Sequence, residues 1–270
     1  MNQELLDKYK RLKEFLSALT SAAVAFSGGV DSTLLLYAAK EALGEKAVAV
    51  TISSNLFPVR EQREAEELCK KLQVRQLIVE NPESEMEEFL QNPKNRCYLC
   101  KREMFQRVRK TVGELGITEI VEGTNWDDDV DDRPGFRAIQ ELGILSPLRI
   151  LRFSKQEIRE LSRQFELPTW QKPSYACLAS RIPYGEVITE EKLHMIDKAE
   201  QLLFSLGFCQ LRVRIHGTVA RIELLPEEFH KLLKEPTRRI VHEQLKKLGF
   251  SYVTLDLMGY RTGSMSEPYI

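Results

Sequence analysis

The 270-residue sequence lacks the features of several large protein classes. It has no apolar run near the roughly 18 residues that a membrane-spanning helix needs, so we expect no membrane partner. It has no excess of basic charge, because 39 Lys and Arg residues face 40 Asp and Glu residues. That balance argues against a protein whose main partner is a long nucleic acid. The charged, amphipathic amino-terminal stretch also lacks the apolar segment of a signal peptide.

Cysteine and histidine are scarce, and their placement excludes further classes. Five cysteines, an odd number, do not predict a disulfide framework, so we expect a reduced, cytoplasmic protein. All four histidines follow residue 190, and a Ser-His or Cys-His nucleophile pair therefore cannot form within the first two-thirds of the chain. Hydrophobic residues nevertheless make up 43% of the chain, which is enough for a substantial core.

Short apolar runs alternate with charged, amphipathic stretches through the first two-thirds of the chain. Strands are expected over 22–26, 46–52, 74–80 and 118–124, and helices over 32–43, 59–72, 97–115 and 151–167. This alternation predicts an α/β domain, in which helices cover both faces of a parallel sheet. Ser154 and Glu157 have the spacing of a capping box near the start of the last of these helices.

The pattern changes near residue 186, where a second, smaller α+β domain is expected. Its predicted elements are a helix over 189–208, a hairpin over 211–224 with Gly217 at the turn, two further helices, and a strand over 251–260. The Pro- and Gly-bearing stretch 181–187 is the expected boundary. The sequence therefore predicts two domains, over 1–185 and 186–270.

A glycine-rich loop with the sequence SGGVDS joins the first expected strand to the first helix after it. Gly28 and Gly29 let the backbone turn tightly and present N–H groups, and the helix N-terminus adds partial positive charge. The hydroxyls of Ser27 and Ser32 add donors, so the loop can bind phosphate. It lacks the Gly-Lys-Ser/Thr ending of a Walker A loop. Because the Asp31 carboxylate would repel phosphates, we expect it to hold a bridging Mg²⁺ ion.

Three of the cysteines form a candidate metal site. Cys97 and Cys100 share one face at the start of an expected helix, where thiolates are favoured, and Cys177 lies in a Pro-flanked loop. Three thiolates without an evident fourth ligand suit a 4Fe–4S cluster with one open iron better than a tetrahedral zinc site. A redox pair or zinc knuckle at 97 and 100 remains an alternative. Cys69 and Cys209 are expected to be ordinary small hydrophobes.

The expected hairpin places Arg212 and Arg214 on one face, and Arg221 shares a face with Glu223 on the return strand. A solvated outer face of an antiparallel sheet would explain this alternation. Two arginines on alternate residues can also bind a phosphate or two carboxylates by paired hydrogen bonds, and Glu223 can bind a metal or orient an arginine. The candidates for substrate binding are Arg181, Arg212, Arg214, Glu223 and Arg261.

The SGGVDS string resembles the signature of the PP-loop ATP pyrophosphatases, which cleave ATP between its α- and β-phosphates. The segment 122–129, EGTNWDDD, resembles the second conserved loop of that family, although an acidic surface turn would read the same. Together with PSYACLASRIPYG, RVRIHGTVARIEL and DLMGYRTGSM, these strings make nearly the whole chain resemble the LarE family. The resemblance implies an adenine nucleotide α-hydrolase-like fold and an ATP-dependent sulfurtransferase. Its implied substrate is pyridinium-3,5-biscarboxylic acid mononucleotide, used for nickel-pincer cofactor synthesis.

The resemblance also implies roles for particular residues. In some members the cysteine at position 177 gives up its own sulfur, whereas others hold a 4Fe–4S cluster on three cysteines. With cysteines at 97, 100 and 177, this sequence resembles the cluster-bearing branch, and Cys177 and Asp31 are its implied catalytic residues. The implied partners are a small-molecule nucleotide and further copies of the chain, as in a hexamer. The residues implied to bind ATP are Ser27, Gly28, Gly29, Asp31, Ser32 and Gly123.

Three other functions are compatible with part of the pattern. A tRNA thiolase of the same superfamily also pairs a PP-loop with three cysteines, but the sequence shows neither the basic excess nor a zinc-ribbon segment that tRNA binding would need. An amidating enzyme, such as an NAD or GMP synthetase, has no use for the cysteines. A nucleotide-sensing module would bind ATP without releasing pyrophosphate.

Overall fold

The computed structural model describes residues 3–128, 134–173, 176–261 and 263–265, and the chain divides into two compact units. Unit 1 comprises Met1–Met86 and Asn95–Tyr175, and unit 2 comprises Glu87–Lys94 and Ala176–Ile270. This division differs from the expected boundary after residue 185. Within unit 2, the backbone N–H groups of Gly185 and Ile188 donate to the carbonyls of Asn92 and Leu90. These long-range hydrogen bonds attach the short segment Glu87–Lys94 to the later segment Ala176–Ile270.

Unit 1 is built on a four-stranded parallel sheet with the strand order β3-β2-β1-β4. The strands are β1 (Ala22–Ala25), β2 (Ala47–Ser53), β3 (Arg75–Glu80) and β4 (Ile120–Val121). The chain passes from β1 to β2 and β3 on one side and then places β4 on the other side of β1. The order of the strands therefore reverses between β1 and β4, and open α/β sheets bind ligands at the carboxyl ends of the strands at such a point.

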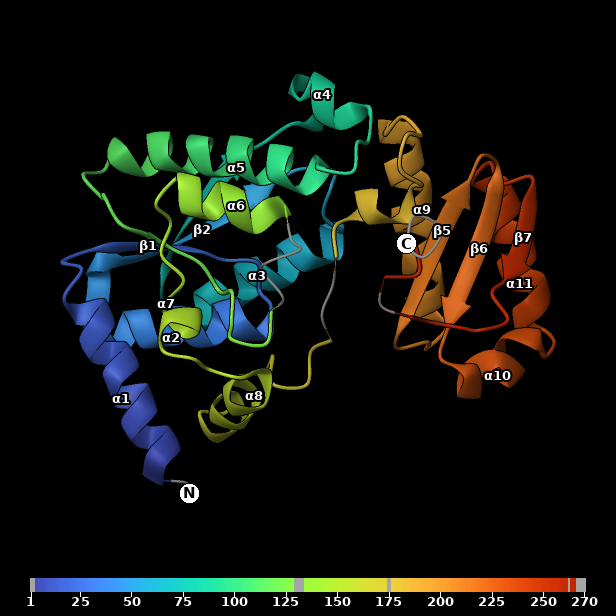
Figure 1. Cartoon of the computed structure of the whole chain (residues 1–270). Helices are drawn as coiled ribbons and strands as arrows, with labels where there is room; N and C mark the ends of the chain where they lie inside the picture. The colour runs from blue at the N-terminus through green and yellow to red at the C-terminus, as the bar shows by residue number, and fades with distance from the viewer. Residues whose placement is uncertain (1–2, 129–133, 174–175, 262, 266–270) are drawn as a thin grey trace. The chain divides into compact units, whose positions relative to one another are not determined.

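Helices cover both faces of this sheet, as the sequence predicts (Figure 1). Val24 packs into the core that contains side chains from α1, α2, α3 and α8, whereas its neighbour Ala23 packs into the core under α5 and α6. This alternation follows from the period of two along a strand. The helices of unit 1 are α1 (Gln3–Ser17), α2 (Val30–Leu43), α3 (Val59–Lys71), α5 (Arg96–Gly113), α6 (Pro134–Glu141), α7 (Pro147–Ile150) and α8 (Lys155–Gln164).

The expected helix over 151–167 is shorter in the structure, because α8 begins at Lys155. Arg152 has a φ of 59°, a left-handed conformation that separates α7 from α8. The predicted capping box is confirmed: Glu157 N–H donates to Ser154 Oγ at 3.2 Å, and Ser154 N–H donates to Glu157 Oε2 at 2.7 Å. This cap satisfies two backbone donors of the first turn and fixes where α8 begins.

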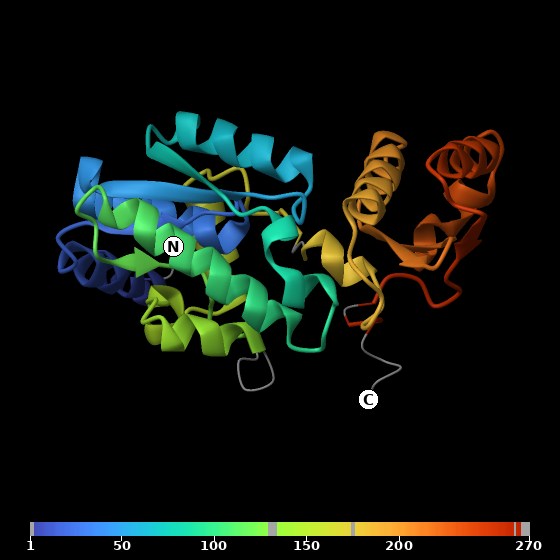
Figure 2. The ribbon, with the colours of Figure 1, turned by 90° about the horizontal axis from the view of Figure 1, so that it is seen from above.

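Unit 2 contains a three-stranded sheet with the order β5-β6-β7 (Figures 1 and 2). The predicted hairpin is present, with β5 (Leu211–His216) antiparallel to β6 (Val219–Leu224) and Gly217 at φ +57° in the turn. The strand β7 (Tyr252–Leu255) pairs parallel to β6. The helices are α4 (Glu87–Leu90), α9 (Glu190–Ser205), α10 (Phe229–Leu233) and α11 (Thr237–Lys247). Short 3-10 turns cover Gly44–Lys46, Glu83–Glu85, Leu178–Arg181 and Pro226–Glu228.

The β5–β6 hairpin has one apolar and one charged face, as its alternation predicts. The apolar face, with Val213 and Ile222 paired across it, is buried. The opposite face, which we call the charged face, carries Arg212, Arg214, Arg221 and Glu223. Among the helices that the structure describes, none has the length and apolar character that crossing a membrane requires.

Candidate functional site

The glycine-rich loop, residues 27–32, lies at the carboxyl end of β1, beside the point where the strand order reverses. Since β1 and β4 are parallel neighbours, the segment after β4 emerges at the same edge of the sheet. The Asn125 side chain from this segment donates to Asp31 Oδ1 at 3.2 Å. The two segments that the sequence singled out in the first two-thirds of the chain therefore meet within unit 1.

Polar groups line the inside of the glycine-rich loop. The hydroxyls of Ser27 and Ser32 lie 3.2 Å apart, and the N–H of Gly29 points toward Ser27 Oγ at 3.4 Å. Gly29 is the N-cap of α2, and no side chain caps this helix. The first turn of a helix carries N–H groups without intrahelical partners and a partial positive charge, so the loop presents donors where an anion can accept them.

Gly28 has a φ of +67°, and a methyl group there would lie 3.3 Å from the Cα and Cβ of Ala65 on α3. We expect Gly28→Ala to destabilise the protein by about 2 kcal/mol, because left-handed backbone costs an alanine about 1–2 kcal/mol and the contact with α3 adds to it. ATP affinity should also fall at least about tenfold, since a shift of the loop misplaces its donors.

Gly116→Ala is the matched control for Gly28→Ala, because Gly116 has a φ of +73° but nothing lies within 4 Å of a methyl group there. Chemical unfolding and calorimetric titration with ATP measure the two effects. Equal ATP affinity in the two variants would show that close packing of Gly28 on α3 does not matter for the loop.

Gly123 keeps the start of α2 open. A Cβ atom at this position would lie 3.1 Å from the backbone nitrogen of Ser32 and 3.3 Å from the Cβ of Asp31. The absence of a side chain therefore leaves the Ser32 N–H accessible from the β4 side. This explains in physical terms why a glycine suits the start of the second loop, next to a backbone donor that an anion would use.

The Asp31 carboxylate is held by cations and amides. Lys155 Nζ, from the start of α8, lies 2.5 Å from Asp31 Oδ2, and the Asp31 side chain is 22% exposed. Within each unit, the described residues contain no group of three or more His, Cys, Asp or Glu side chains that could hold a metal ion. Mg²⁺ is, however, commonly held by one or two carboxylates together with substrate phosphates, so Asp31 alone fits as its protein ligand.

The acidic segment after β4 forms a turn at the surface, and side-chain contacts hold this turn in place. Asp128 Oδ2 accepts the N–H of Asn125 at 3.0 Å, and Asp127 Oδ2 accepts the N–H of Lys155 at 2.7 Å. Two guanidinium groups lie near the half-exposed Trp126 ring, with that of Arg149 5.4 Å and that of Arg152 5.1 Å from the ring centroid. These contacts join the segment to the beginning of α8 and so fix Asn125 beside Asp31.

The cysteines are divided between the units. Cys97 is exposed and Cys100 is partly buried, and both lie in the first two turns of α5 in unit 1, three residues apart. Cys177 is partly buried and belongs to unit 2. Cys69 is buried as expected, and burial raises the pKa of its thiol to about 12, which makes it unreactive. Cys209 is exposed and is not part of a core.

Arg181 is fully buried and is engaged by protein groups. Its guanidinium forms two hydrogen bonds with Glu200 of α9, at 3.0 and 3.1 Å. The Nη1 atom also donates to the carbonyls of Ala176 and Cys177, at 2.6 and 2.9 Å. Glu200 Oε1 further accepts the backbone N–H of Val213 on β5 at 3.0 Å. The structure thus makes Arg181 the residue that holds the Cys177 turn to α9 and β5, and its predicted role in substrate binding stays a prediction.

Replacing Arg181 by Leu is expected to destabilise unit 2 by about 3–5 kcal/mol, because the Glu200 carboxylate is then left buried without its partner. Adding Glu200→Gln removes that buried charge, so the double variant should recover at least about 1 kcal/mol. Hydrogen exchange of the β5 amides under native conditions reports on unit 2 specifically. A double variant no more stable than Arg181→Leu would show that the buried charge is not the cause.

The charged face is buried, which excludes the solvated outer face that its pattern also allowed. Arg212 and Arg214 are 4% and 6% exposed, and Glu223 is inaccessible. Arg214 donates to Glu223 Oε2 at 3.1 and 3.0 Å, and Arg221 donates to Glu223 Oε1 at 3.1 Å. Glu223 therefore orients arginines, one of the two roles expected for it. Its remaining contact is the Ser264 hydroxyl, which donates to Oε1 at 2.6 Å.

Burial lowers the pKa of Arg212, and repulsion from the nearby Arg181 guanidinium lowers it further. The pKa of Arg214 is lowered by burial as well, although Glu223 acts in the opposite direction. Three buried guanidinium groups, those of residues 181, 212 and 214, lie near three buried carboxylates, those of residues 197, 200 and 223. Because these guanidinium groups are desolvated, an anionic ligand that paired with Arg212 or Arg214 would stabilise them.

Arg261 lies near the edge of this cluster. It donates to Asp256 Oδ1 at 3.1 Å and to the carbonyl of Gly259 at 3.1 Å. Burial alone would raise the pKa of Asp256, but the N–H of Met258 and the Arg261 guanidinium outweigh burial and lower it. Arg261 is about a quarter exposed and shapes the tail segment, so its predicted role in substrate binding stays a prediction.

Comparisons with known proteins agree with this geometry. The NAD synthase family profile matches residues 6–113, which include the glycine-rich loop. The Synechocystis sp. protein slr1717 is 40% identical over 264 residues, 97% of this chain and 98% of that protein. The pyridinium-3,5-bisthiocarboxylic acid mononucleotide synthase of Lactiplantibacillus plantarum is 34% identical over 264 residues, 97% of this chain and 95% of that enzyme. The chain belongs to the family of that synthase, the LarE family.

A further relative is matched over a smaller part of its length. The GMP synthase of Aeropyrum pernix is 29% identical over 223 residues, 75% of this chain and 42% of that protein. Membership of the LarE family, together with the match to the NAD synthase profile, makes the chain an ATP-dependent sulfurtransferase with a PP-loop fold. The family and the α/β fold with a smaller second unit were both expected from the sequence, and both are confirmed.

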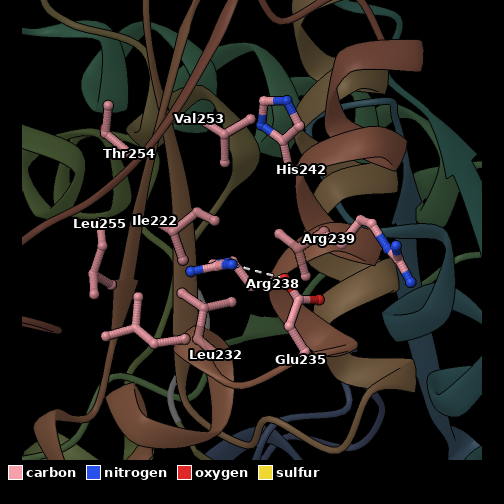
Figure 3. Close-up of a pocket in the computed structure, with 11 residues that line it drawn as sticks. Ile222, Leu232, Glu235, Arg238, Arg239, His242, Val253, Thr254 and Leu255 are labelled. Carbon is pink, nitrogen blue, oxygen red and sulfur yellow. Dashed lines mark hydrogen bonds and ion pairs between the residues drawn. The ribbon is translucent and has the colours of Figure 1, made fainter.

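Unit 2 of this LarE-family chain also contains a cavity of about 480 Å³, between β7 and the helices α10 and α11 (Figure 3). Leu232, Val253 and Ile222 are among the side chains that line it, and Arg238 at its rim donates to Glu235 at 2.8 Å. Because Ile222 alternates with the charged residues along β6, the cavity lies on the opposite face of the sheet from the charged face. The cavity is therefore distinct from the charged face.

Several residues that contact the candidate site residues were not themselves predicted from the sequence. Lys155 and Asn125 contact Asp31, and Lys172 contacts the glycine-rich loop. Glu200 holds Arg181, and Ser264 holds Glu223. The only signals in the sequence are weak: Asn125 lies within the recognised segment 122–129, and Lys155 follows a recognised helix cap. The others are ordinary charged or polar residues whose partners lie far away along the chain.

Proposed function

We propose that the protein adenylylates a carboxylate of pyridinium-3,5-biscarboxylic acid mononucleotide and converts it to a thiocarboxylate, with release of pyrophosphate and AMP. The observation that carries the proposal is the glycine-rich loop, whose inward-facing donors and uncapped helix stand beside Asp31 at the point where the strand order reverses. The full-length similarity to the Lactiplantibacillus synthase supports the choice of substrate.

The chemistry explains why ATP is needed. A carboxylate is a poor electrophile, because oxide would have to leave. Attack of a carboxylate oxygen on the α-phosphate forms the acyl adenylate and expels pyrophosphate. A sulfide then attacks the acyl carbon, the C–O bond to AMP breaks, and the thiocarboxylate forms. Sulfide is already anionic, so this sequence of steps needs no histidine base, in keeping with the absence of histidine from residues 1–190.

The residues of unit 1 bind and orient the triphosphate in this proposal. Ser27, Ser32 and the N–H of Gly29 donate to phosphate oxygens, and Gly123 leaves room beside the Ser32 N–H. Mg²⁺, when bound, neutralises charge on the leaving pyrophosphate. Asp31 would hold this ion, and Lys155, whose ammonium group now faces that carboxylate, would turn to a phosphate oxygen.

The buried charged face of unit 2 would bind the anionic groups of the pyridinium mononucleotide. Arg212 and Arg214 can donate paired hydrogen bonds to its phosphate or its carboxylates. Their support is the burial of both guanidinium groups and the carboxylate of Glu223, which fixes the orientation of Arg214. Arg181 would position the Cys177 turn in the same unit.

We further propose that Cys97, Cys100 and Cys177 hold a 4Fe–4S cluster that carries the sulfur. The support is chemical: two accessible thiols lie three residues apart in the early turns of α5, where the helix favours thiolates, and three cysteine ligands leave one iron open. Cys97 and Cys100 fit as two of the ligands, and unit 2 contributes the third. The alternative is direct donation of the Cys177 sulfur without a cluster.

Iron and acid-labile sulfide in anaerobically purified protein test the cluster. About four of each per chain are expected, with Cys97→Ser reducing both severely. A colourless, iron-free protein after reconstitution would overturn the cluster and leave Cys177 as a sacrificial donor, giving at most one product per chain.

Adding tRNA in place of the mononucleotide tests the thiolase alternative, since stimulated pyrophosphate release would favour it. The expected homo-oligomer is tested by light scattering of the purified protein.

A further inference from the structure

Lys172 contacts the glycine-rich loop from a distant part of the chain. Its ammonium group donates to the carbonyl oxygen of Gly28 at 2.9 Å and lies 2.7 Å from Glu64 Oε2 on α3. The Lys172 side chain is only 12% exposed, although lysine is among the residues most rarely buried. A buried lysine directed at a backbone carbonyl of the loop therefore needs a reason beyond solubility.

The reason lies in the geometry of the peptide bond. The C=O of Gly28 and the N–H of Gly29 belong to one planar trans peptide, so they point in opposite directions. Lys172 draws the carbonyl to one side, and the N–H then faces Ser27 Oγ on the inside of the loop. Between two glycines this peptide has unusual freedom to rotate. Without a contact on the carbonyl, rotation would turn a carbonyl oxygen toward the phosphates and remove a donor.

The surroundings of Lys172 fit this reason. Glu64 directly precedes Ala65, whose Cα and Cβ would lie 3.3 Å from a Cβ atom at position 28, so α3 supplies both a wall beside the loop and a counter-ion for the lysine. An ion pair with a partly exposed glutamate stabilises a fold by at most about 1 kcal/mol and would not by itself explain a buried lysine. The hydrogen bond that Lys172 donates to the Gly28 carbonyl is the contact that affects the glycine-rich loop.

We propose that Lys172 is a positioning residue for the nucleotide: by holding the Gly28 carbonyl, it keeps the Gly29 N–H directed at the phosphates. This inference rests on the proposed function of the glycine-rich loop as an ATP site. In this proposal Lys172 acts on the backbone of the loop, even when no ATP is bound. A lysine that contacts a phosphate directly would act only when ATP is bound.

The test compares Lys172→Met and Lys172→Arg with Lys40→Met as a control. Lys40 lies near the far end of α2 and pairs with Glu45 at 2.5 Å, away from the loop. Hydrogen exchange of residues 27–32 in nucleotide-free protein, and calorimetric titration with ATP and Mg²⁺, are the readouts. We expect Lys172→Met to accelerate exchange in the loop at least about tenfold and to weaken ATP binding about tenfold. Lys172→Arg should keep both within about threefold, and Lys40→Met should change neither.

Two results would overturn the proposal. If Lys172→Met weakens ATP binding but leaves exchange in the nucleotide-free loop unchanged, the lysine acts on the phosphates and not on the peptide. If both readouts match the wild type, the lysine has no role in the loop. Thermal unfolding checks that each variant is folded. If Lys172→Met does not fold, Lys172→Arg keeps the test decisive. Failure of the wild-type protein to bind ATP would instead contradict the proposed function, and the exchange experiment would still test Lys172.

Discussion

Replacing Asp31 by Ala is expected to lower kcat/KM for ATP-dependent pyrophosphate release by at least about 1,000-fold. In the described part of this site, Asp31 is the carboxylate directed at the phosphates. The nearby Asp127 and Asp128 carboxylates each accept a backbone N–H group instead. Without Asp31, residues 27–32 offer no other carboxylate that could hold Mg²⁺ against the leaving pyrophosphate. Pyrophosphate release with the mononucleotide as acceptor, measured by a coupled assay, gives the rate.

The same variant should keep its affinity for inorganic pyrophosphate in the absence of Mg²⁺. Removing the Asp31 carboxylate releases the Lys155 ammonium group, which then faces the phosphates without competition. Asp7→Ala is the control, since Asp7 lies on α1 and accepts a hydrogen bond only from Gln3 among the contacts described for it. An Asp31→Ala protein that retains more than a tenth of the wild-type kcat/KM would contradict the role assigned to this carboxylate.

Replacing Cys177 by Ala is expected to abolish thiocarboxylate formation, with a loss of at least about 1,000-fold, while pyrophosphate release from the first turnover continues. The reason is that the two half-reactions use different groups. In the proposed mechanism, adenylylation depends on the loop and Asp31 in unit 1, whereas sulfur transfer depends on the thiol of residue 177 in unit 2. Both the cluster and the sacrificial-donor form of the proposal require this cysteine.

Cys209→Ala is the matched control for Cys177→Ala, because it removes the other cysteine of unit 2, which is exposed. Mass spectrometry of the mononucleotide after a single turnover measures the product. Thiocarboxylate at wild-type level from Cys177→Ala would show that the sulfur comes from another source. Loss of pyrophosphate release as well would mean that the cysteine serves adenylylation, which would contradict the role in sulfur transfer alone that is proposed for it.

The parts of the fold that depend on local pattern could be predicted from the sequence. The two glycines and the apolar run before them indicated the loop between β1 and α2, and the spacing of Ser154 and Glu157 indicated the cap of α8. Alternation along 211–224 correctly separated Arg212 and Arg214 from Val213. Each of these features is decided by residues within a few positions of one another.

The parts that depend on distant contacts could not be predicted. A strand shows which residues share a face but not what covers that face, so the burial of Arg214 and Glu223 was not evident. Arg181 is similar: its partner Glu200 lies 19 residues away on α9, and only the structure shows that the guanidinium holds the turn of Cys177. Lys172 and Gly28 are 144 residues apart, and no periodicity links them.

The most direct test of the account is a single anaerobic reaction of the purified protein with ATP, Mg²⁺ and pyridinium-3,5-biscarboxylic acid mononucleotide. We predict that pyrophosphate and AMP form only when the mononucleotide is present, and that a thiocarboxylate of it appears in step with AMP. Release of pyrophosphate that is independent of the mononucleotide, or its formation without any sulfur in the product, would contradict the account.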